Sequence, residues 1–249
     1  MASVTRRIKE IKQPHGGYIN PKSFSVIEID DGVTLSSPEN VEPYLVGTAV
    51  DYLTRALISK NPRQAFRISI RGALLAGQIA KAEEKLKMIS GLSEESIVSA
   101  CQLVVYDGVY RARKLSHNPD DILPNDSTIK NIATMVNRAI SFFEEYGPVI
   151  KEGFVFSGGY TETVKTGDGD FITQDTLWDF KVSVSAPKSK DTLQLLMYYI
   201  MGLHSTDENL RRIKRLGIFN PRLNKVYLLN TSDISADVIK SVESDVIRY

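Results

Sequence analysis

Two aspartates and a lysine stand close together in the second half of the chain. Asp170 follows a glycine turn, and Asp179 and Lys181 flank Phe180 in a segment typical of a β-strand. Because successive side chains of a strand point to opposite faces, Asp179 and Lys181 share one face and Phe180 lies on the other. A carboxylate and an ammonium on one face of an otherwise apolar strand are costly to bury without a purpose or a partner. The pattern therefore predicts a site with a chemical task.

The chemistry that this set favours is metal-dependent hydrolysis of a phosphodiester bond. That reaction needs an activated water and relief for the charge that builds on the phosphate, and a bound Mg²⁺ or Mn²⁺ supplies both. Hard cations prefer oxygen ligands, so Asp170 and Asp179 are the predicted metal ligands. Lys181 would orient or deprotonate the attacking water, or stabilise the phosphorane-like charge. These three residues are the predicted catalytic core.

The same residues resemble the core motif of the PD-(D/E)xK nuclease superfamily, in which an aspartate and a short hairpin precede (D/E)-x-K. Asp170 and Asp179-Phe180-Lys181 match it, with a spacing that suits a turn between two strands. Gln194-x-x-x-Tyr198 further resembles the Q-x-x-x-Y element of the RecB-like and lambda-exonuclease-like branch. The resemblance implies that Gln194 and Tyr198 lie near the metal site and contact DNA or its phosphate, and it adds both to the catalytic set.

That branch often carries an upstream helix with G-x-x-x-H, whose histidine binds the metal. Gly47 and Asp51 have this spacing, with an aspartate in place of the histidine. The resemblance thus implies Asp51 as the third metal ligand, and Glu144 or Glu145 at the end of a later helix is the alternative source of this acid. It also implies a restriction-endonuclease-like α/β core, with residues 60–150 as a helical insertion.

Basic residues near the predicted site are candidates for binding the phosphate backbone of nucleic acid. Lys188 and Lys190 lie in the loop after Lys181. A second cluster falls on a predicted helix after the Gln194–Tyr198 helix, and a solvated helix face is the alternative interpretation of it. The cluster consists of Arg211, Arg212, Lys214 and Arg215.

Several of these residues also have a purely structural interpretation. Asp179 and Lys181 could form a surface pair on an edge strand. Gln194 could be the third residue of a capping box that begins at Asp191. The other structural interpretations are core packing for Tyr198, Tyr199, Trp178 and Cys101, a turn for Asp168 with a secondary metal role as its alternative, and ordinary surface or capping roles for His15, His117 and His204.

The order of elements predicts an α+β fold, in which a helical first half precedes a mixed sheet flanked by helices. Apolar residues recur at a helical period up to residue 146 and alternate at a strand period afterwards. We expect a single nuclease domain over residues 1–249, with the catalytic sheet and its helices at about 151–230. The predicted helices cover residues 44–59, 71–89, 97–106, 128–146, 192–203, 208–216 and 235–247, and the predicted strands cover 23–28, 33–35, 154–157, 161–165, 170–172, 176–183, 217–219 and 225–229.

Composition narrows the class of protein. The chain has 249 residues with 31 Lys and Arg against 30 Asp and Glu, so it lacks the strongly basic character of a nucleic-acid coat protein. No apolar run is long enough for a membrane span, and the basic start lacks the apolar region of a secretory signal. A single cysteine fits a cytoplasmic location, and the absence of a phosphate-binding loop motif and of a four-cysteine cluster argues against a motor or an iron–sulfur centre.

The sequence therefore predicts a Mg²⁺- or Mn²⁺-dependent nuclease that acts on DNA, with RNA as an open alternative substrate. Exonuclease and structure-directed endonuclease both fit, and the settings typical of such enzymes are recombination, repair, phage replication and antiviral defence. A homo-oligomer and a partner protein in a recombination or phage complex are both open. The alternative is a catalytically silent nuclease-fold module for nucleic-acid binding or assembly of a phage or mobile-element complex, and we expect no membrane partner.

Overall fold

The computed structural model describes residues 2–249 and divides the chain into two compact units. The sheet unit comprises the residues up to Ile29 together with Phe143–Tyr249, and the helical unit comprises Asp30–Phe142. The helical unit starts earlier than the predicted insertion, because it includes the helix of Asp51. The single domain expected from the sequence is thus built from two separate cores.

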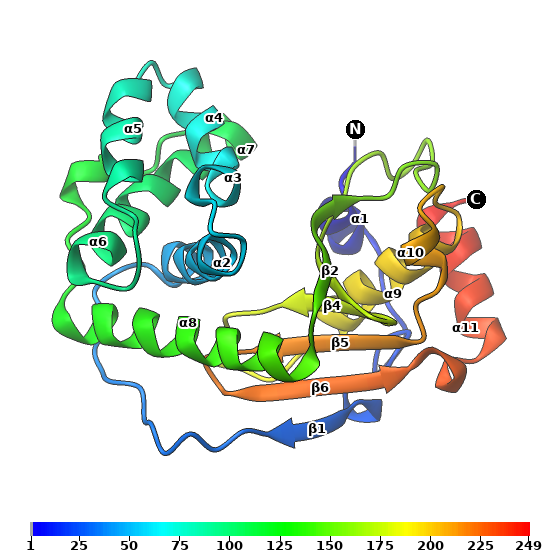
Figure 1. The fold of residues 1–249 in the computed structure, drawn as a ribbon. Coiled ribbons are helices and arrows are strands. Elements are labelled where there is room, and N and C mark those ends of the chain that lie inside the picture. The colour runs from blue at the N-terminus through cyan, green and yellow to red at the C-terminus, as the bar shows by residue number, and fades with distance from the viewer. Residues whose placement is uncertain (1) are drawn as a thin grey trace. The chain divides into compact units, whose positions relative to one another are not determined.

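A six-stranded mixed sheet forms the centre of the sheet unit (Figure 1). Its order is β1-β6-β5-β4-β3-β2, and only β4 and β5 are parallel neighbours. Parallel neighbours need a long crossover connection, and here α9 (Ser189–Leu203) lies in it. The α+β class and the mixed sheet are confirmed. The strands are β1 (Ser25–Glu28), β2 (Val149–Val155), β3 (Asp168–Thr173), β4 (Thr176–Phe180), β5 (Arg215–Asn220) and β6 (Lys225–Asn230).

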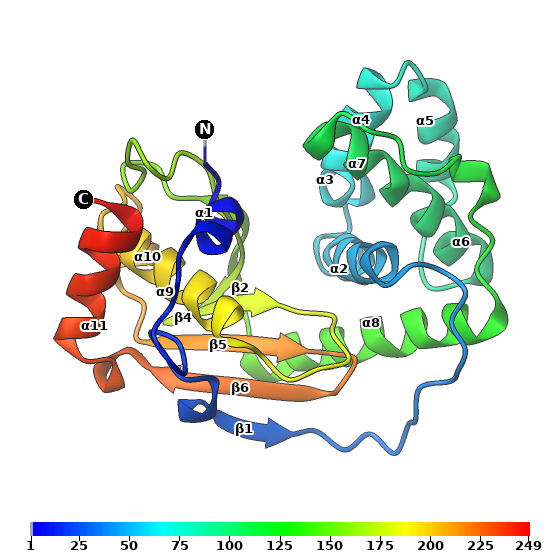
Figure 2. The same ribbon diagram turned by 180° about the vertical axis from the view of Figure 1, so that it is seen from behind.

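One face of this sheet packs against the helices of the sheet unit (Figure 2). Leu177 of β4 and Ile218 of β5 are buried on this face with most of α9. On the other face, Trp178 packs edge-to-face on Tyr146, at a ring-centroid distance of 5.4 Å. The predicted burial of Trp178 is confirmed. The remaining helical segments of the unit are α1 (Val4–Glu10), η1 (Pro21–Ser23), α10 (Glu208–Arg211), η4 (Thr231–Asp233), α11 (Ala236–Ser241) and the π-helical turn η5 (Val242–Ile247).

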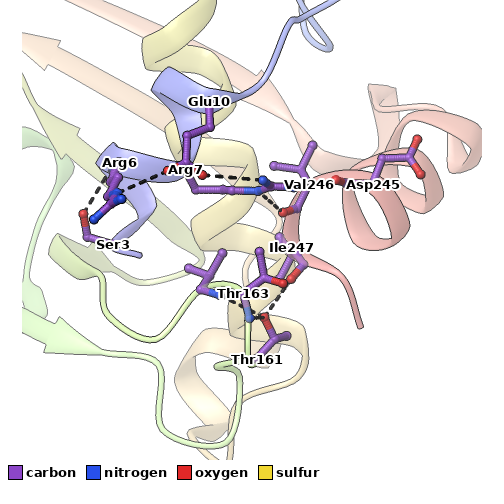
Figure 3. A network of polar contacts seen from close by, with 10 residues as sticks. Ser3, Arg6, Arg7, Glu10, Thr161, Thr163, Asp245, Val246 and Ile247 are labelled. Atoms are coloured by element: carbon purple, nitrogen blue, oxygen red, sulfur yellow. Dashed lines mark hydrogen bonds and ion pairs between the residues drawn. The ribbon is translucent and has the colours of Figure 1, made fainter. Parts of the chain in front are cut away.

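Arg7 fastens the start of the chain to its end (Figure 3). Its guanidinium is largely buried and donates through Nε to the carbonyl of Val246 at 2.8 Å and through Nη2 to that of Asp245 at 2.9 Å. Carbonyls at the end of a helix lack intrahelical donors, so a cation placed there satisfies them. Thr161 donates to the carbonyl of Ile247 at 2.7 Å in the same region. The basic N-terminal segment is therefore a structural part of the sheet unit.

The helical unit contains a set of mostly short helices with their own buried core. Its longest elements are α2 (Pro43–Ser59) and α8 (Asp126–Tyr146), and α8 ends in the sheet unit. Cys101 is fully buried in this core, as predicted. The other segments are α3 (Pro62–Ala65), α4 (Arg67–Leu75), α5 (Ile79–Lys87), α6 (Glu94–Leu103), η2 (Val104–Tyr106), α7 (Asp107–Ala112) and η3 (Pro119–Asp121).

Four predictions of local structure are wrong. The expected helix 71–89 is interrupted between α4 and α5, where Gly77 has a φ of +69° that L-residues rarely adopt. The expected hairpin of 23–28 with 33–35 does not form, because β1 pairs with β6 instead. Residues 161–165 form no strand, and the expected helix 208–216 is reduced to α10, since Arg215 already begins β5.

Candidate active site

The hairpin of β3 and β4 places the two predicted metal ligands opposite each other. Phe171 pairs with Trp178 in this antiparallel ladder, so the same register puts Asp170 directly across from Asp179. Both side chains lie on the face that α9 covers, because they alternate with Phe171 and Trp178. The backbone N–H of Phe180 donates to Asp170 Oδ2 at 2.9 Å. Like charges directly across a strand pair repel each other, so this arrangement favours a cation between them.

Asp179 is almost completely buried, with 2% of its surface exposed. Its Oδ1 accepts a hydrogen bond from Gln194 Nε2 at 3.1 Å. Its Oδ2 lies 3.1 Å from Lys181 Nζ, but this ion pair lacks hydrogen-bond geometry, and Oδ2 has no hydrogen-bond donor among residues 2–249. A buried carboxylate oxygen without a donor is costly unless a ligand completes it.

Lys181 follows the last residue of β4 and continues the ladder, since its N–H donates to the carbonyl of Phe219 at 2.9 Å. Its ammonium lies between two carboxylates, 3.1 Å from Asp179 Oδ2 and 3.6 Å from Asp191 Oδ1. The charge of Asp179 raises the pKa of Lys181 above its usual range, with a smaller contribution from Asp191 and despite the opposing effect of burial. Lys181 therefore carries a positive charge at neutral pH in this state and can donate hydrogen bonds. The expectation that Asp179 and Lys181 share one face is confirmed.

Gln194 and Tyr198 lie one turn apart on α9 and face the sheet. Gln194 Nε2 is 3.1 Å from Asp179 Oδ1 and 3.2 Å from the hydroxyl of Tyr198. Tyr198 is buried, and its ring stacks on Phe156 at a centroid distance of 5.0 Å. It therefore packs in the core and also accepts a hydrogen bond from Gln194. Burial raises the pKa of Tyr198, and the charges of Asp170 and Asp179 raise it further. The negative potential of the two aspartates thus extends to the helix.

The capping role considered for Gln194 is wrong. Lys188 is the N-cap of α9, and the third residue of the helix is Asp191, whose Oδ2 accepts from the Lys188 N–H at 2.8 Å. Gln194 lies beyond the first turn, and its amide is directed at Asp179. Its position therefore serves the site rather than the helix terminus.

A pocket of about 100 Å³ opens beside Lys181, at the carboxyl ends of β4 and β5. Lys188 and Lys190 line it, as predicted for residues near the site. Both lysine side chains are exposed, and within the described part of the chain no ion pair holds them. The hydroxyl-bearing residues Ser183 and Ser185 also line the pocket. The three ammonium groups outnumber the one carboxylate in the lining, that of Asp191, so together with the start of α9 they make this pocket suitable for an anion.

The structure does not bring the predicted arginine cluster to this pocket. Arg215 pairs with Thr176 at the start of β4, whereas Asp179 pairs with Ile218, so Arg215 lies three residues, about 10 Å, back along the sheet. Arg215 forms an ion pair with Asp175 at 2.9 Å. Of the other three members, Arg212 pairs with Glu208 at 3.2 Å, Arg211 donates to the carbonyl of Thr206 at 3.3 Å, and Lys214 is exposed. The sequence placed them near the site only because it predicted one continuous helix there.

Asp51 lies on α2 in the helical unit, where Arg55 one turn later holds both of its oxygens. Arg55 Nε is 2.7 Å from Asp51 Oδ1, and Nη2 is 3.2 Å from Oδ2. Its role as the third metal ligand stays a prediction. Glu144 and Glu145 are exposed at the end of α8, and their role as alternatives stays a prediction too. Asp168 is exposed and begins β3 opposite Val155, so its expected turn is wrong.

The side chains at the site indicate which metal ion they could hold. No cluster of three or more His, Cys, Asp or Glu side chains placed to hold a metal ion occurs among residues 2–249. Asp170 and Asp179 nevertheless make a pair of oxygen donors, and Asp179 Oδ2 is available as an acceptor. Mg²⁺ is usually held by one or two carboxylates with substrate phosphate and water, whereas Zn²⁺ takes three or four protein ligands. The residues present therefore fit Mg²⁺ or Mn²⁺ and do not fit zinc.

Asp191 is the site residue that the sequence analysis missed, because it was considered only as a helix cap. Its Oδ1 lies 3.6 Å from Lys181 Nζ, so it forms a second ion pair with the lysine. One signal could have revealed it. Elements that are consecutive in sequence are usually adjacent in space. The first turn of α9, which carries Asp191, is therefore expected near the end of β4, where Lys181 lies.

Comparisons with protein-family models, with curated proteins and with solved structures find no match to this chain. None of the helices within residues 2–249 is both long and apolar enough to cross a membrane. Any assignment of function therefore depends on the site residues themselves and on their contacts.

Proposed function

We propose that this protein is a metal-dependent nuclease that hydrolyses phosphodiester bonds of DNA. The observation that carries the proposal is the buried Oδ2 of Asp179, which lacks a hydrogen-bond donor within the described chain and lies on the same face as Asp170 and beside Lys181. A carboxylate with only a structural role would be expected to have both oxygens satisfied. The open oxygen supports a site that a cation and a phosphate complete together.

In this proposal Asp170 and Asp179 would hold Mg²⁺ or Mn²⁺. Such an ion, when bound, lowers the pKa of a water and offsets charge on the phosphate. The ammonium of Lys181 donates hydrogen bonds to the attacking water or to a phosphate oxygen, and Asp191 keeps it aimed. Gln194 fixes the orientation of the Asp179 carboxylate through its hydrogen bond to Oδ1.

The pocket beside Lys181 supports a nucleic acid as the substrate. A phosphodiester chain presents further phosphates next to the one that is cleaved, and Lys188 and Lys190 line a pocket that suits one of them. These lysines, rather than Arg211, Arg212 and Arg215, are the nucleic-acid contacts that we propose for the sheet unit. Exonuclease and structure-directed endonuclease activities both remain compatible with this pocket, as do roles in recombination, repair, phage replication and defence.

The test is cleavage of linear, circular and single-stranded DNA and of RNA by the full chain, with Mg²⁺ or Mn²⁺ and then with EDTA. We expect DNA cleavage that depends on the metal and is lost in Asp179→Asn. Lys240→Ala, which changes an exposed lysine of the same unit, is the matched control and should cleave as the wild type does. Metal-independent cleavage, or full activity of Asp179→Asn, would contradict the proposal.

A second candidate function is a silent nucleic-acid-binding or assembly module. The ion pair of Asp51 with Arg55 favours it, because a carboxylate that is neutralised within its own helix has less tendency to bind a metal. The same substrates, measured for binding as well as for cleavage, separate the two functions. Metal-independent binding of DNA without cleavage of any substrate supports the module, whereas metal-dependent cleavage excludes it.

A further inference from the structure

The positive charge of the helical unit is segregated along the sequence. Residues 52–82 contain six Lys and Arg but no Asp or Glu, and residues 108–119 contain three Lys and Arg and again no acid. The acids of this unit lie elsewhere, many of them in residues 83–95 and 120–126. The whole chain is nearly neutral at +1, so this separation is local and does not follow from a general excess of base.

Two of these basic segments lie side by side in the fold, on α4 and α7 (Figure 2). Gly72 of α4 makes the close approach possible, because a Cβ at that position would lie 1.9 Å from the carbonyl oxygen of Tyr106, directly before α7. The segment after α7 is held as well, since the Lys114 N–H donates to the carbonyl of Gly108 at 3.4 Å. The basic residues on these elements are therefore carried by two closely packed helices.

Some cations of these segments are already paired, and others are available. Arg63 pairs with Glu83 at 2.6 Å, and Arg111 lies 3.7 Å from Asp107. Arg71, Arg113 and Lys114 are exposed, and within residues 2–249 none of the three has an ion-pair partner. We define these three residues as the α4–α7 basic surface. Cations after α7 also stabilise the end of that helix, but Arg71 lies inside α4, so this cannot account for it.

We propose that the α4–α7 basic surface binds the phosphate backbone of DNA. Exposed cations without an ion-pair partner gain affinity for a polyanion by releasing its counterions, and arginine is well suited to phosphate. The acid of α7, Asp107, is buried and accepts hydrogen bonds from Tyr52 and Ser69. The surface belongs to the helical unit and is distinct from the pocket beside Lys181. The proposal depends on the proposed function only for the choice of DNA as the polyanion.

The test is equilibrium binding of the full chain to a fluorescent 20-base-pair DNA duplex in EDTA, at several salt concentrations. Arg71→Glu/Lys114→Glu should weaken binding by about tenfold or more and make the log–log salt dependence shallower by about two. The matched control is Lys87→Glu/Lys130→Glu, which makes the same change of charge at exposed lysines of the same unit and should bind as the wild type does.

A duplex affinity and salt dependence unchanged in Arg71→Glu/Lys114→Glu, or no binding by the wild type, would overturn the proposal. The neutral pair Arg71→Gln/Lys114→Gln keeps it testable if the charge reversal impairs folding, with circular dichroism to check the fold. Binding in EDTA does not depend on cleavage, so it tests the α4–α7 basic surface alone. The nuclease function is tested separately by the cleavage assay with Asp179→Asn.

Discussion

Two buried aspartates, one in each unit, have very different surroundings. Asp107 in the helical unit is 7% exposed, and both of its oxygens are satisfied. The hydroxyl of Tyr52 donates to Oδ2 at 2.6 Å, the hydroxyl of Ser69 donates to Oδ1 at 2.5 Å, and Arg111 Nε lies 3.7 Å from Oδ2. Asp107 thus has the full set of partners that a buried structural carboxylate requires.

Asp179 in the sheet unit is more deeply buried, at 2% exposure, and yet one of its oxygens has no hydrogen-bond donor within residues 2–249. It also lies across from a second aspartate, Asp170. An arrangement that is unfavourable for stability and has an open ligand position is expected where a site serves a function. The comparison therefore separates a carboxylate that stabilises a core from one that is available to a ligand.

Loss of the lysine beside Asp179 should have the largest effect on activity. Lys181→Ala removes a hydrogen-bond donor aimed at the phosphate or the water, so we expect cleavage to fall by about 10²–10³. The corresponding change beside the structural aspartate, Arg111→Ala, should leave cleavage unchanged. Initial rates on linear duplex DNA with Mg²⁺ measure both. Equal activity of Lys181→Ala and wild type would contradict the role of Lys181.

The hydrogen bond from Gln194 to Asp179 is expected to matter less than Lys181 itself. Gln194→Ala leaves the carboxylate in place but removes the donor to Oδ1, so the metal affinity or activity should fall by about 10- to 100-fold. The readout is the Mg²⁺ concentration that gives half-maximal cleavage, which should rise. Gln194→Glu replaces the donor with a charge and should not restore the wild-type value, whereas an unchanged Mg²⁺ requirement in Gln194→Ala would show that the residue only packs.

Substitution of Asp107 should lower the stability of the fold and should not act on the cleavage reaction directly. Asp107→Ala leaves the buried hydroxyls of Tyr52 and Ser69 without their acceptor, so the free energy of unfolding should fall by about 2–4 kcal/mol. Asp179→Asn removes both the repulsion from Asp170 and the ion pair with Lys181, and these two effects on stability have opposite signs, so its loss of stability should be smaller than that of Asp107→Ala. Urea denaturation followed by circular dichroism compares the two, and a larger loss in Asp179→Asn would reverse the comparison.

The smallest expected effect is on the pH dependence of stability. Burial raises the pKa of Asp107, and the hydrogen bonds from Ser69 and Tyr52 offset this only in part. Between the unfolded pKa of about 3.9 and the raised folded value, the folded chain holds more protons, so stability falls as pH rises through this window. Asp107→Asn removes the titration, so its stability relative to wild type should rise with pH there. A difference that does not vary with pH would show that Asp107 is not shifted.

The sequence could predict the sheet-unit site because its parts are local. Asp170 and Asp179 belong to one predicted hairpin, and Gln194, which only the resemblance placed near them, lies on the helix that follows this hairpin. Asp191 was not predicted as a site residue because the sequence indicates only its capping role. Its contact with Lys181 depends on the path of the loop between the two residues, which the sequence does not reveal.

Other features depend on contacts that are distant in sequence. The pairing of Ser25 with Leu228 joins opposite ends of the chain, and nothing local distinguishes it from the expected hairpin. Arg215 falls in a short segment whose apolar residues fit a helix or a strand equally well, and only its place beside β4 decides. The break at Gly77 follows from one backbone conformation that the helical period does not reveal.

The most direct test of the central claim is a calorimetric titration of the full chain with Mn²⁺, in the presence of a duplex DNA whose phosphorothioate linkages resist cleavage. We expect wild type and Asp107→Asn to bind Mn²⁺ and Asp179→Asn not to bind it, because within residues 2–249 Asp179 Oδ2 has no hydrogen-bond donor, whereas both oxygens of Asp107 have one. Equal Mn²⁺ binding by Asp179→Asn and wild type would contradict it.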